Sequence, residues 1–378
     1  MSFRKNVFVL GAGFSADAGA PIIENFFSCA RELKENPVSI LTDRDREVFD
    51  RVIRYRLELD PAVAKVFANL DNIEQLFGFL EMDLQLSSRR DENLREDMPY
   101  LIVRTLEATM NESLPCGYCR LITGPKAATK FSYQYQRNRY SFFVGFVSGL
   151  WNPKKRKDSQ SIDSVITFNY DLILEREMVD LGLAPTYPGP LMDYSGAFSE
   201  AKLGLHLLKM HGSANWLVCS RCKDVIYVRV PQEAEISRAK SQPCPRCRQL
   251  SLLPFIVPPT WNKGIEEKFI RPVWHKALEE LMSAGRLFIV GYSLPDSDQF
   301  FKYLLGLALA RNNEISEIYV VNPSDEVIDR FKQFFSQHLH HRIQYQPRRT
   351  HEFIEKIQEL TKQDFDQTNL ASQLFIRG

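Results

Sequence analysis

Two side chains that could hold water or accept a proton each stand directly after an apolar run. Asn169 follows residues 164–168, and His211 follows residues 205–210. An asparagine amide both donates and accepts hydrogen bonds, so it can orient a water molecule. A neutral imidazole accepts a proton at cellular pH, which suits general-base catalysis. Asn169 and His211 are therefore the candidate catalytic pair, and the alternatives are a strand-end cap for the asparagine and a packed structural histidine.

A glycine-rich turn, residues 11–15 (GAGFS), follows the apolar run at residues 6–10 and leads toward a helix. Glycines permit a tight turn and a close approach of the backbone, so N–H groups at a helix start can hold a pyrophosphate. The turn predicts a dinucleotide site, and a turn without a phosphate ligand is the alternative. The acidic residue that dehydrogenases place after a second strand is not evident, because residues 26–35 are predicted to be helical.

Four cysteines form two Cys-x-x-Cys pairs, Cys219 with Cys222 and Cys244 with Cys247, and 21 residues separate the pairs. This separation is slightly longer than is usual for four-cysteine zinc sites. Four thiolates leave no open position on zinc, which indicates a structural metal. We predict one structural Zn²⁺, with a degenerate, metal-free ribbon as the alternative. A third pair, at positions 116 and 119, has no partner pair and is predicted to be structural.

The elements that must position these residues are short runs rich in β-branched residues, typical of buried parallel strands. They lie at residues 6–10, 164–168, 205–210, 286–290 and 317–321, with a last edge strand at 342–345. All but the last are followed by Gly, Asn or His. Ligands of open α/β sheets bind at the carboxyl ends of the strands. We therefore predict a Rossmann-like parallel sheet that gathers these residues at one edge.

Two insertions and a tail complete the predicted organisation, in which residues 1–350 form one nucleotide-binding domain. Residues 30–157 carry apolar residues at helical spacing, which predicts a large α-helical insertion. Its clearest helical segments are residues 43–58, 72–86 and 97–109. Residues 216–254 hold the four cysteines and predict a small zinc-ribbon-like insertion. Residues 351–378 are expected to form a helical C-terminal tail.

Composition gives few further indications of partners. The chain of 378 residues is 44% hydrophobic and 25% charged, with a formal net charge of +1, so nothing indicates nucleic acid directly. The basic run at 154–157 is interpreted as a solvated loop. The apolar stretch near the N-terminus is too short for a signal peptide, and no later one is long enough to cross a bilayer. We expect a cytoplasmic protein with no membrane partner.

Five short motifs resemble those of the sirtuin family and occur in the same order. Residues 11–21 (GAGFSADAGAP) resemble the Gly-Ala-Gly-x-Ser and Gly-x-Pro opening of sirtuins, and residues 167–171 (TFNYD) resemble their Thr-Gln-Asn-Ile-Asp. His211-Gly212 resembles their catalytic His-Gly. Residues 291–293 (GYS) resemble their Gly-Thr-Ser, and residues 321–322 (VN) resemble their adenosine-side Val-Asn. The resemblance spans residues 7–322 and implies that the chain binds NAD.

Two departures distinguish the chain from the sirtuin deacylases. Those enzymes carry Asp-Phe-Arg after the first motif, whereas Pro21 is here followed by residues 22–24 (IIE). The predicted helical insertion is also larger than theirs. Both features, together with residues 168–170 (FNY), resemble bacterial sirtuin-like proteins of anti-phage defence. This second resemblance implies hydrolysis of NAD.

The resemblance also implies roles for individual residues. Asn169 would hold water and His211 would accept a ribose hydroxyl proton, while the nicotinamide–ribose bond breaks through an oxocarbenium-like ribose. The residues expected to bind the cofactor all follow predicted strands; they are Gly11, Ala12, Gly13, Ser15, Asp17, Asp171, Gly291, Ser293 and Asn322.

Three functions agree with these residues. The favoured one is cleavage of NAD to nicotinamide and ADP-ribose by the NAD-depleting effector of a bacterial anti-phage system. The alternatives are an NAD-dependent protein deacylase and a module that senses NAD or ADP-ribose and acts through a partner ATPase or nuclease. Because a free NAD hydrolase would poison its own cell, we expect control by homo-oligomerisation or by a partner such as a motor ATPase.

Overall fold

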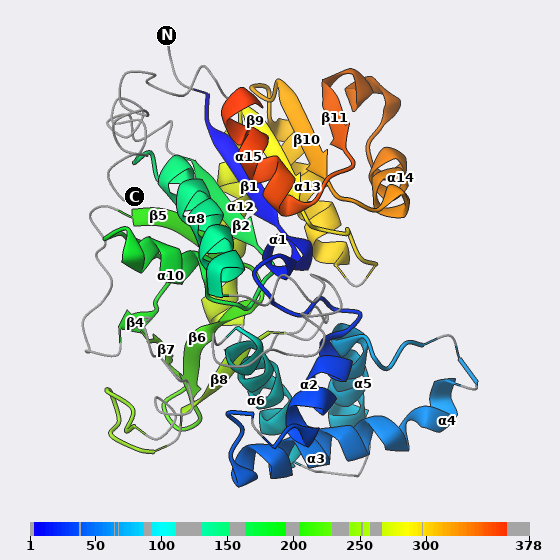
Figure 1. Cartoon of the computed structure of the whole chain (residues 1–378), viewed down its shortest axis with the longest axis vertical. Coiled ribbons are helices and arrows are strands. Elements are labelled where there is room, and N and C mark those ends of the chain that lie inside the picture. The colour runs from blue at the N-terminus through cyan, green and yellow to red at the C-terminus, as the bar shows by residue number, and fades with distance from the viewer. Residues whose placement is uncertain are drawn as a thin grey trace.

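A seven-stranded parallel sheet forms the centre of the protein (Figure 1). The computed structural model describes residues 4–37, 39–63, 65–66, 68–86, 92–110, 130–150, 163–193, 204–228, 242–250, 252–257, 267–296 and 298–360. The strand order is β11-β10-β9-β1-β2-β5-β3, and every neighbouring pair is parallel. The strands are β1 (Asn6–Leu10), β2 (Ser164–Thr167), β3 (Ala184–Thr186), β5 (Gly204–Lys209), β9 (Arg286–Val290), β10 (Glu317–Val321) and β11 (Ile343–Gln346). The predicted Rossmann-like sheet is confirmed.

Burial on both faces explains why most of these strands are unbroken apolar runs. Helices α8 (Lys130–Val147) and α15 (Thr350–Leu360) cover one face, and α12 (Glu267–Met282) and α13 (Gln299–Arg311) cover the other (Figure 1). Phe8 of β1 stacks on Phe288 of β9 with centroids 4.8 Å apart and meets Phe143 of α8 edge-on at 5.2 Å. The short edge strand β3 was not predicted, because the run Ala-Pro-Thr carries no strand pattern.

A group of helices beyond the carboxyl end of β1 forms a second body, which we call the helical lobe (Figure 1). It consists of α2 (Phe26–Glu35), α3 (Asp43–Glu58), α4 (Asp60–Val63), α5 (Ile73–Leu86) and α6 (Glu92–Thr109). Thr42 and Asp45 form a capping box that starts α3. Helix α8 lies within the same predicted insertion, but its residues Tyr140 and Phe143 pack in the core of the large sheet.

A four-stranded sheet carries the cysteines, and its strand β6 begins directly after His211. Its order is β4-β7-β6-β8, formed by β4 (Met192–Asp193), β7 (Val225–Tyr227), β6 (Gly212–Cys219) and β8 (Leu252–Ile256). Leu217, Ile226 and Leu252 of this sheet belong to the same buried core as Leu101 of α6. The two segments predicted as separate insertions therefore share one hydrophobic core, which joins the small sheet to the helical lobe.

The remaining described elements follow or precede strands of the large sheet. They are α1 (Ala12–Ala16), α10 (Ile173–Asp180), α14 (Asp325–Phe334) and the 3-10 helix Gln337–Arg342. The predicted C-terminal helix begins at Thr350, and positions 116, 119, 154–157 and 361–378 lie outside the described residues. Among the described helices, none is both long and apolar enough to cross a membrane.

Candidate functional site

The carboxyl ends of four neighbouring strands bring the predicted residues to one edge of the large sheet. The strands lie in the order β9-β1-β2-β5. Gly291 and Gly11 come directly after β9 and β1, while Asn169 and His211 lie two residues beyond the ends of β2 and β5. Segments that are far apart in the sequence therefore meet at the edge where α/β sheets bind their ligands.

Asn169 is tied to the glycine turn by its side-chain amide. Its Nδ2 donates to the carbonyl oxygen of Gly11 and to the Oγ of Ser15, both at 2.8 Å. Its backbone N–H donates to Thr167 Oγ1 at 3.1 Å. Both protons of the amide nitrogen are used by these two bonds, so in this conformation the amide can act on water only through Oδ1. Asn169 would therefore orient water only as a hydrogen-bond acceptor.

His211 is almost completely buried, with 2% of its surface exposed. Its Nε2 lies 3.4 Å from Oδ1 of Asp298, and the hydroxyl of Tyr292 donates to Oδ2 of the same carboxylate at 2.7 Å. Aromatic rings surround the imidazole, with Phe168 at 5.2 Å and Trp274 at 6.4 Å between ring centroids. At this burial, a ribose could reach His211 only if the side chains around it moved.

The glycines of the first turn are required by close contact with the turn after β9. A Cβ on Gly11 would lie 2.5 Å from Cα of Tyr292, and one on Gly13 would lie 3.0 Å from Cα of Gly291. The N–H groups of Gly11 and Gly13 donate to Val290 and Gly291 carbonyl oxygens at 3.1 and 2.9 Å. These two amides are thus engaged within the protein, contrary to the expectation that they are free for a phosphate. A Gly13→Val substitution would therefore disturb the packing of these two turns.

Three further residues predicted to bind the cofactor have protein partners on the last helices. Oδ2 of Asp17 accepts the backbone N–H of His351 at 3.1 Å and lies 2.8 Å from Nδ1 of that ring. The carbonyl oxygen of Ser293 accepts from Arg330 at 2.7 Å, and Oδ1 of Asn322 accepts the N–H of Ser324 at 3.0 Å. The structure therefore brings Gly11, Gly13, Ser15, Asn169 and Gly291 into one connected group, while Asp17, Ser293 and Asn322 also anchor neighbouring elements.

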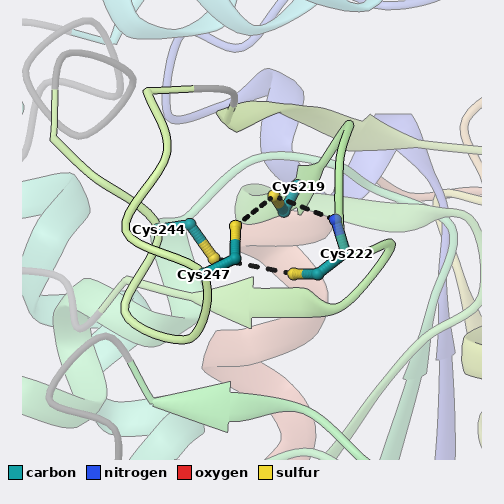
Figure 2. A group of neighbouring side chains, drawn as sticks. All are labelled: Cys219, Cys222, Cys244 and Cys247. Carbon is teal, nitrogen blue, oxygen red and sulfur yellow. Dashed lines mark hydrogen bonds between the residues drawn. The ribbon is translucent and has the colours of Figure 1, made fainter.

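The four predicted metal ligands form one cluster at the end of the small sheet (Figure 2). Their sulfur atoms all lie within 4.8 Å of one another, with Cys219–Cys247 at 3.5 Å and Cys222–Cys244 at 3.7 Å. A zinc tetrahedron with bonds of about 2.3 Å has sulfur–sulfur edges of roughly 3.8 Å. The cluster therefore has the size that zinc requires. Burial and the neighbouring thiols raise the pKa of the Cys222 thiol to about 12, and a bound cation would favour the thiolate instead.

Each cysteine pair ends in the same backbone turn. Lys223 and Arg248, directly after the second cysteine of each pair, have φ angles of 60° and 62°. Their N–H groups donate to the carbonyl oxygens of Cys219 and Cys244 at 2.9 and 2.8 Å. Two similar turns thus present two pairs of sulfur atoms to one centre, which is the arrangement of a structural site without an open position.

Residues 163–343 match the family model described as a SIR2-like domain. The match covers slightly less than half of the chain, so residues 163–343, here called the SIR2-like domain, are similar to that family. The SIR2-like domain includes Asn169, His211 and the four cysteines, whereas the glycine turn at residues 11–15 precedes the matched segment. No curated protein sequence matches the chain.

Several solved sirtuin structures align with the chain. One is described as Sir2 with a p53 peptide and NAD⁺, at 13% identity and a TM-score of 0.39. Another is Sir2Tm bound to a propionylated peptide, at 12% identity and a TM-score of 0.40. Both alignments cover 95% of this chain and 94% of the other.

Within the SIR2-like domain, a buried ion pair fixes the loop that carries Asn169. Nζ of Lys209 donates to the carbonyl oxygen of Asp171 at 2.6 Å and lies 3.1 Å from Oε1 of Glu175. The side chains of Lys209 and Glu175 are 2% and 1% exposed. Asp171 itself forms a turn just before the following helix, because its Oδ1 accepts the N–H of Ile173 at 3.1 Å. Lys209 thus connects the end of β5, next to His211, with the loop after β2.

Replacing Lys209 by methionine should lower the free energy of unfolding by about 3–5 kcal/mol, because Glu175 would keep a buried charge without its partner. Chemical denaturation measures the change. The control is Lys332→Met, which removes a lysine from the exposed pair with Asp329, where both side chains are about half exposed at 49% and 61%. Equal stability of the two variants would show that the buried pair does not hold the loop.

Asp298, Trp274 and Lys209 are parts of the site that the sequence did not reveal. Asp298 lies in a turn after the motif at residues 291–293, and no sequence motif includes it. Trp274 donates from its indole N–H to the carbonyl oxygen of Met210 at 3.1 Å, directly before His211. Lys209 stands within an apolar strand, and an ionisable side chain inside such a run is the one signal that could have indicated a buried partner.

Proposed function

We propose that the chain binds NAD at the carboxyl ends of β9, β1, β2 and β5 and hydrolyses the bond between nicotinamide and ribose. The observation that carries the proposal is the placement of Asn169 and His211 after neighbouring strands, within a SIR2-like domain and beside the glycine turn. A SIR2-like domain supports NAD-dependent chemistry of the sirtuin kind. We propose more specifically that this cleavage needs no acylated substrate.

Residues near the reacting ribose would orient the attacking water, accept a proton and stabilise the positive charge. The nicotinamide ring of NAD is a positively charged pyridinium and leaves as a neutral molecule, so its departure needs no strong general acid. The enzyme must chiefly stabilise the oxocarbenium-like ribose that remains. Oδ1 of Asn169 would accept from the attacking water, and His211 would accept a proton from a ribose hydroxyl. The rings of Phe168 and Tyr170, which lie 5.2 and 6.4 Å from the imidazole, would exclude other water and offer their faces to a cation.

The domain boundaries and the partners belong to the same proposal. Residues 1–350 would form one NAD-binding unit, with the helical insertion 30–157, the zinc-ribbon-like insertion 216–254 and the tail 351–378 attached to it. The helical lobe and the tail are the surfaces that we propose for self-association or for a partner such as a motor ATPase. An effector that depletes NAD during phage infection would need such control.

Incubation of the purified protein with NAD, with and without an acetylated lysine peptide, tests the function. We expect nicotinamide and ADP-ribose, or a cyclised form of ADP-ribose, in the absence of peptide. Chromatography with mass detection identifies the products. Turnover that required the peptide and yielded acylated ADP-ribose would establish the deacylase alternative. The sensing alternative would be established if the protein bound NAD without turnover, including under conditions in which it self-associates.

A further inference from the structure

A buried carboxylate lies beside the imidazole of the candidate general base. Asp298, in the turn between β9 and α13, is 3% exposed, and its Oδ1 is 3.4 Å from Nε2 of His211. Its other oxygen accepts the hydroxyl of Tyr292 at 2.7 Å. The backbone of the turn holds the residue in place, because the N–H groups of Phe301 and Lys302 donate to its carbonyl oxygen at 3.1 and 3.2 Å.

The surroundings of this pair are acidic and apolar. Burial, together with the charges of Asp298 and of Glu74 from α5, holds the pKa of Tyr292 well above its usual value. Burial and the same two carboxylates also raise the pKa of Tyr170, whose ring centroid lies 6.4 Å from that of His211. Both phenols therefore stay protonated, and Tyr292 remains a hydrogen-bond donor to Asp298. Among the described residues, the titratable groups linked to these rings and to the imidazole are thus Asp298, Glu74, Tyr170 and Tyr292.

We propose that Asp298 is a positioning residue that keeps the proton of neutral His211 on Nε2 and so makes Nδ1 the basic nitrogen. The proposal rests on the proposed function. When His211 accepts a ribose hydroxyl proton, the O–H bond breaks, an N–H bond forms at Nδ1, and the electron pair stays on the ribose oxygen. The imidazolium then carries a positive charge, which the Asp298 carboxylate stabilises through Nε2–H. This division of roles resembles that of the aspartate and histidine in serine proteases.

The burial of Asp298 supports this assignment. A carboxylate taken out of water loses several kcal/mol of hydration unless a charge or hydrogen bonds compensate it. The Tyr292 hydroxyl donates to Oδ2, and Nε2 of His211 lies 3.4 Å from Oδ1. A neutral imidazole can donate to Oδ1 only if its proton is on Nε2.

Asp298→Asn tests the proposal, with Asp296→Asn as the matched control. Asp296 belongs to the same turn, but its side chain is 94% exposed and pairs with Lys302 at 2.9 Å. Nitrogen NMR of histidine-labelled protein reports the protonated ring nitrogen directly, and His211→Gln assigns the resonances. We expect the Nε2–H form for His211 in the unchanged protein and in Asp296→Asn. In Asp298→Asn we expect a lower titration midpoint, because the carboxylate charge no longer stabilises the imidazolium.

Kinetics give a second readout. Asp298→Asn should lower kcat for NAD cleavage by about 100- to 10,000-fold with KM nearly unchanged, as expected for loss of support to a general base. Tyr292→Phe, which removes only the hydroxyl that holds Oδ2, should act in the same direction more weakly.

The two proposals fail in different ways. If the unchanged protein does not cleave NAD but His211 carries its proton on Nε2, the proposed function fails and the positioning by Asp298 stands. A proton on Nδ1 of His211 in the unchanged protein would overturn the inference whatever the activity. The inference would also be overturned if Asp298→Asn and Asp296→Asn had the same His211 titration midpoint and the same kcat. Should Asp298→Asn not fold, the unchanged protein and Tyr292→Phe still decide the outcome through the ring-nitrogen signals.

Discussion

Replacement of His211 by alanine is expected to lower the turnover of NAD by about 100- to 10,000-fold while NAD affinity changes little. The imidazole would act chiefly in the transition state, when the ribose hydroxyl loses its proton, and a group used there affects kcat more than binding. Nicotinamide release measures turnover, and titration calorimetry measures affinity. His211→Gln serves as a second variant, because alanine leaves a cavity among the rings of Phe168 and Trp274.

The matched control for this variant is His206→Ala. His206 lies on β5, the strand that leads to His211, five residues earlier in the chain, and it is partly buried. Burial lowers the pKa of its imidazole, so it stays neutral at cellular pH. We expect turnover close to that of the unchanged protein for His206→Ala. Hydrolysis of NAD at the normal rate by His211→Ala would show that His211 is a packed structural residue, and the fold would remain as described.

Asn169→Ala belongs to the same experiment. It removes Oδ1, the proposed hydrogen-bond acceptor for the attacking water. It also removes the two hydrogen bonds that Nδ2 donates to Gly11 and Ser15. Asn169→Asp keeps the size and the acceptor oxygen but loses those donors, and it places a carboxylate near the carbonyl of Gly11. We expect both variants to lose turnover, by roughly 100- to 1,000-fold for the alanine. A larger loss in affinity than in turnover for Asn169→Ala would show that its main role is to hold the glycine turn.

Removal of the metal is the second change with a large expected effect. Freshly purified protein should contain about one equivalent of zinc per chain, and Cys244→Ser should lose it together with several kcal/mol of stability. The reason lies in the shared core: Cys219 and Cys244 are buried with Leu101 and Leu106 of α6. Loss of zinc should therefore increase hydrogen exchange in the helical lobe as well as in the small sheet.

Cys29→Ser is the matched control for the metal experiment. Cys29 is 2% exposed and lies in the same core on α2, yet its thiol is not part of the cysteine cluster. Its replacement should leave the zinc content at one equivalent and cost only the burial of a hydroxyl, about 1–3 kcal/mol. Elemental analysis and thermal melting distinguish the two variants. Unchelated protein that contained no zinc would show that the cluster is a degenerate ribbon.

The sequence by itself determined the longer strands of the central sheet, several helices and the type of sheet. Strands buried on both faces must be apolar along their whole length, so β1, β9 and β10 coincide with the predicted runs. Helices α2 and α3 also coincide, because their apolar residues recur at the helical period and the capping box of Thr42 marks a start. The cysteine spacing likewise predicted the cluster. These signals are local, and each lies within a short segment of chain.

Only the tertiary structure decided which segments meet. The helical lobe and the cysteine-bearing sheet share a core although about a hundred residues separate them, since each leaves an apolar face that the other covers. The amides of Gly11 and Gly13 bind the turn after β9, because the strand order places β9 beside β1. Asp298 lies 3.4 Å from His211 although β1 and β2 separate β9 from β5, because the turn before α13 crosses this edge of the sheet. No local pattern encodes such contacts, because strand order and long-range packing fix them together.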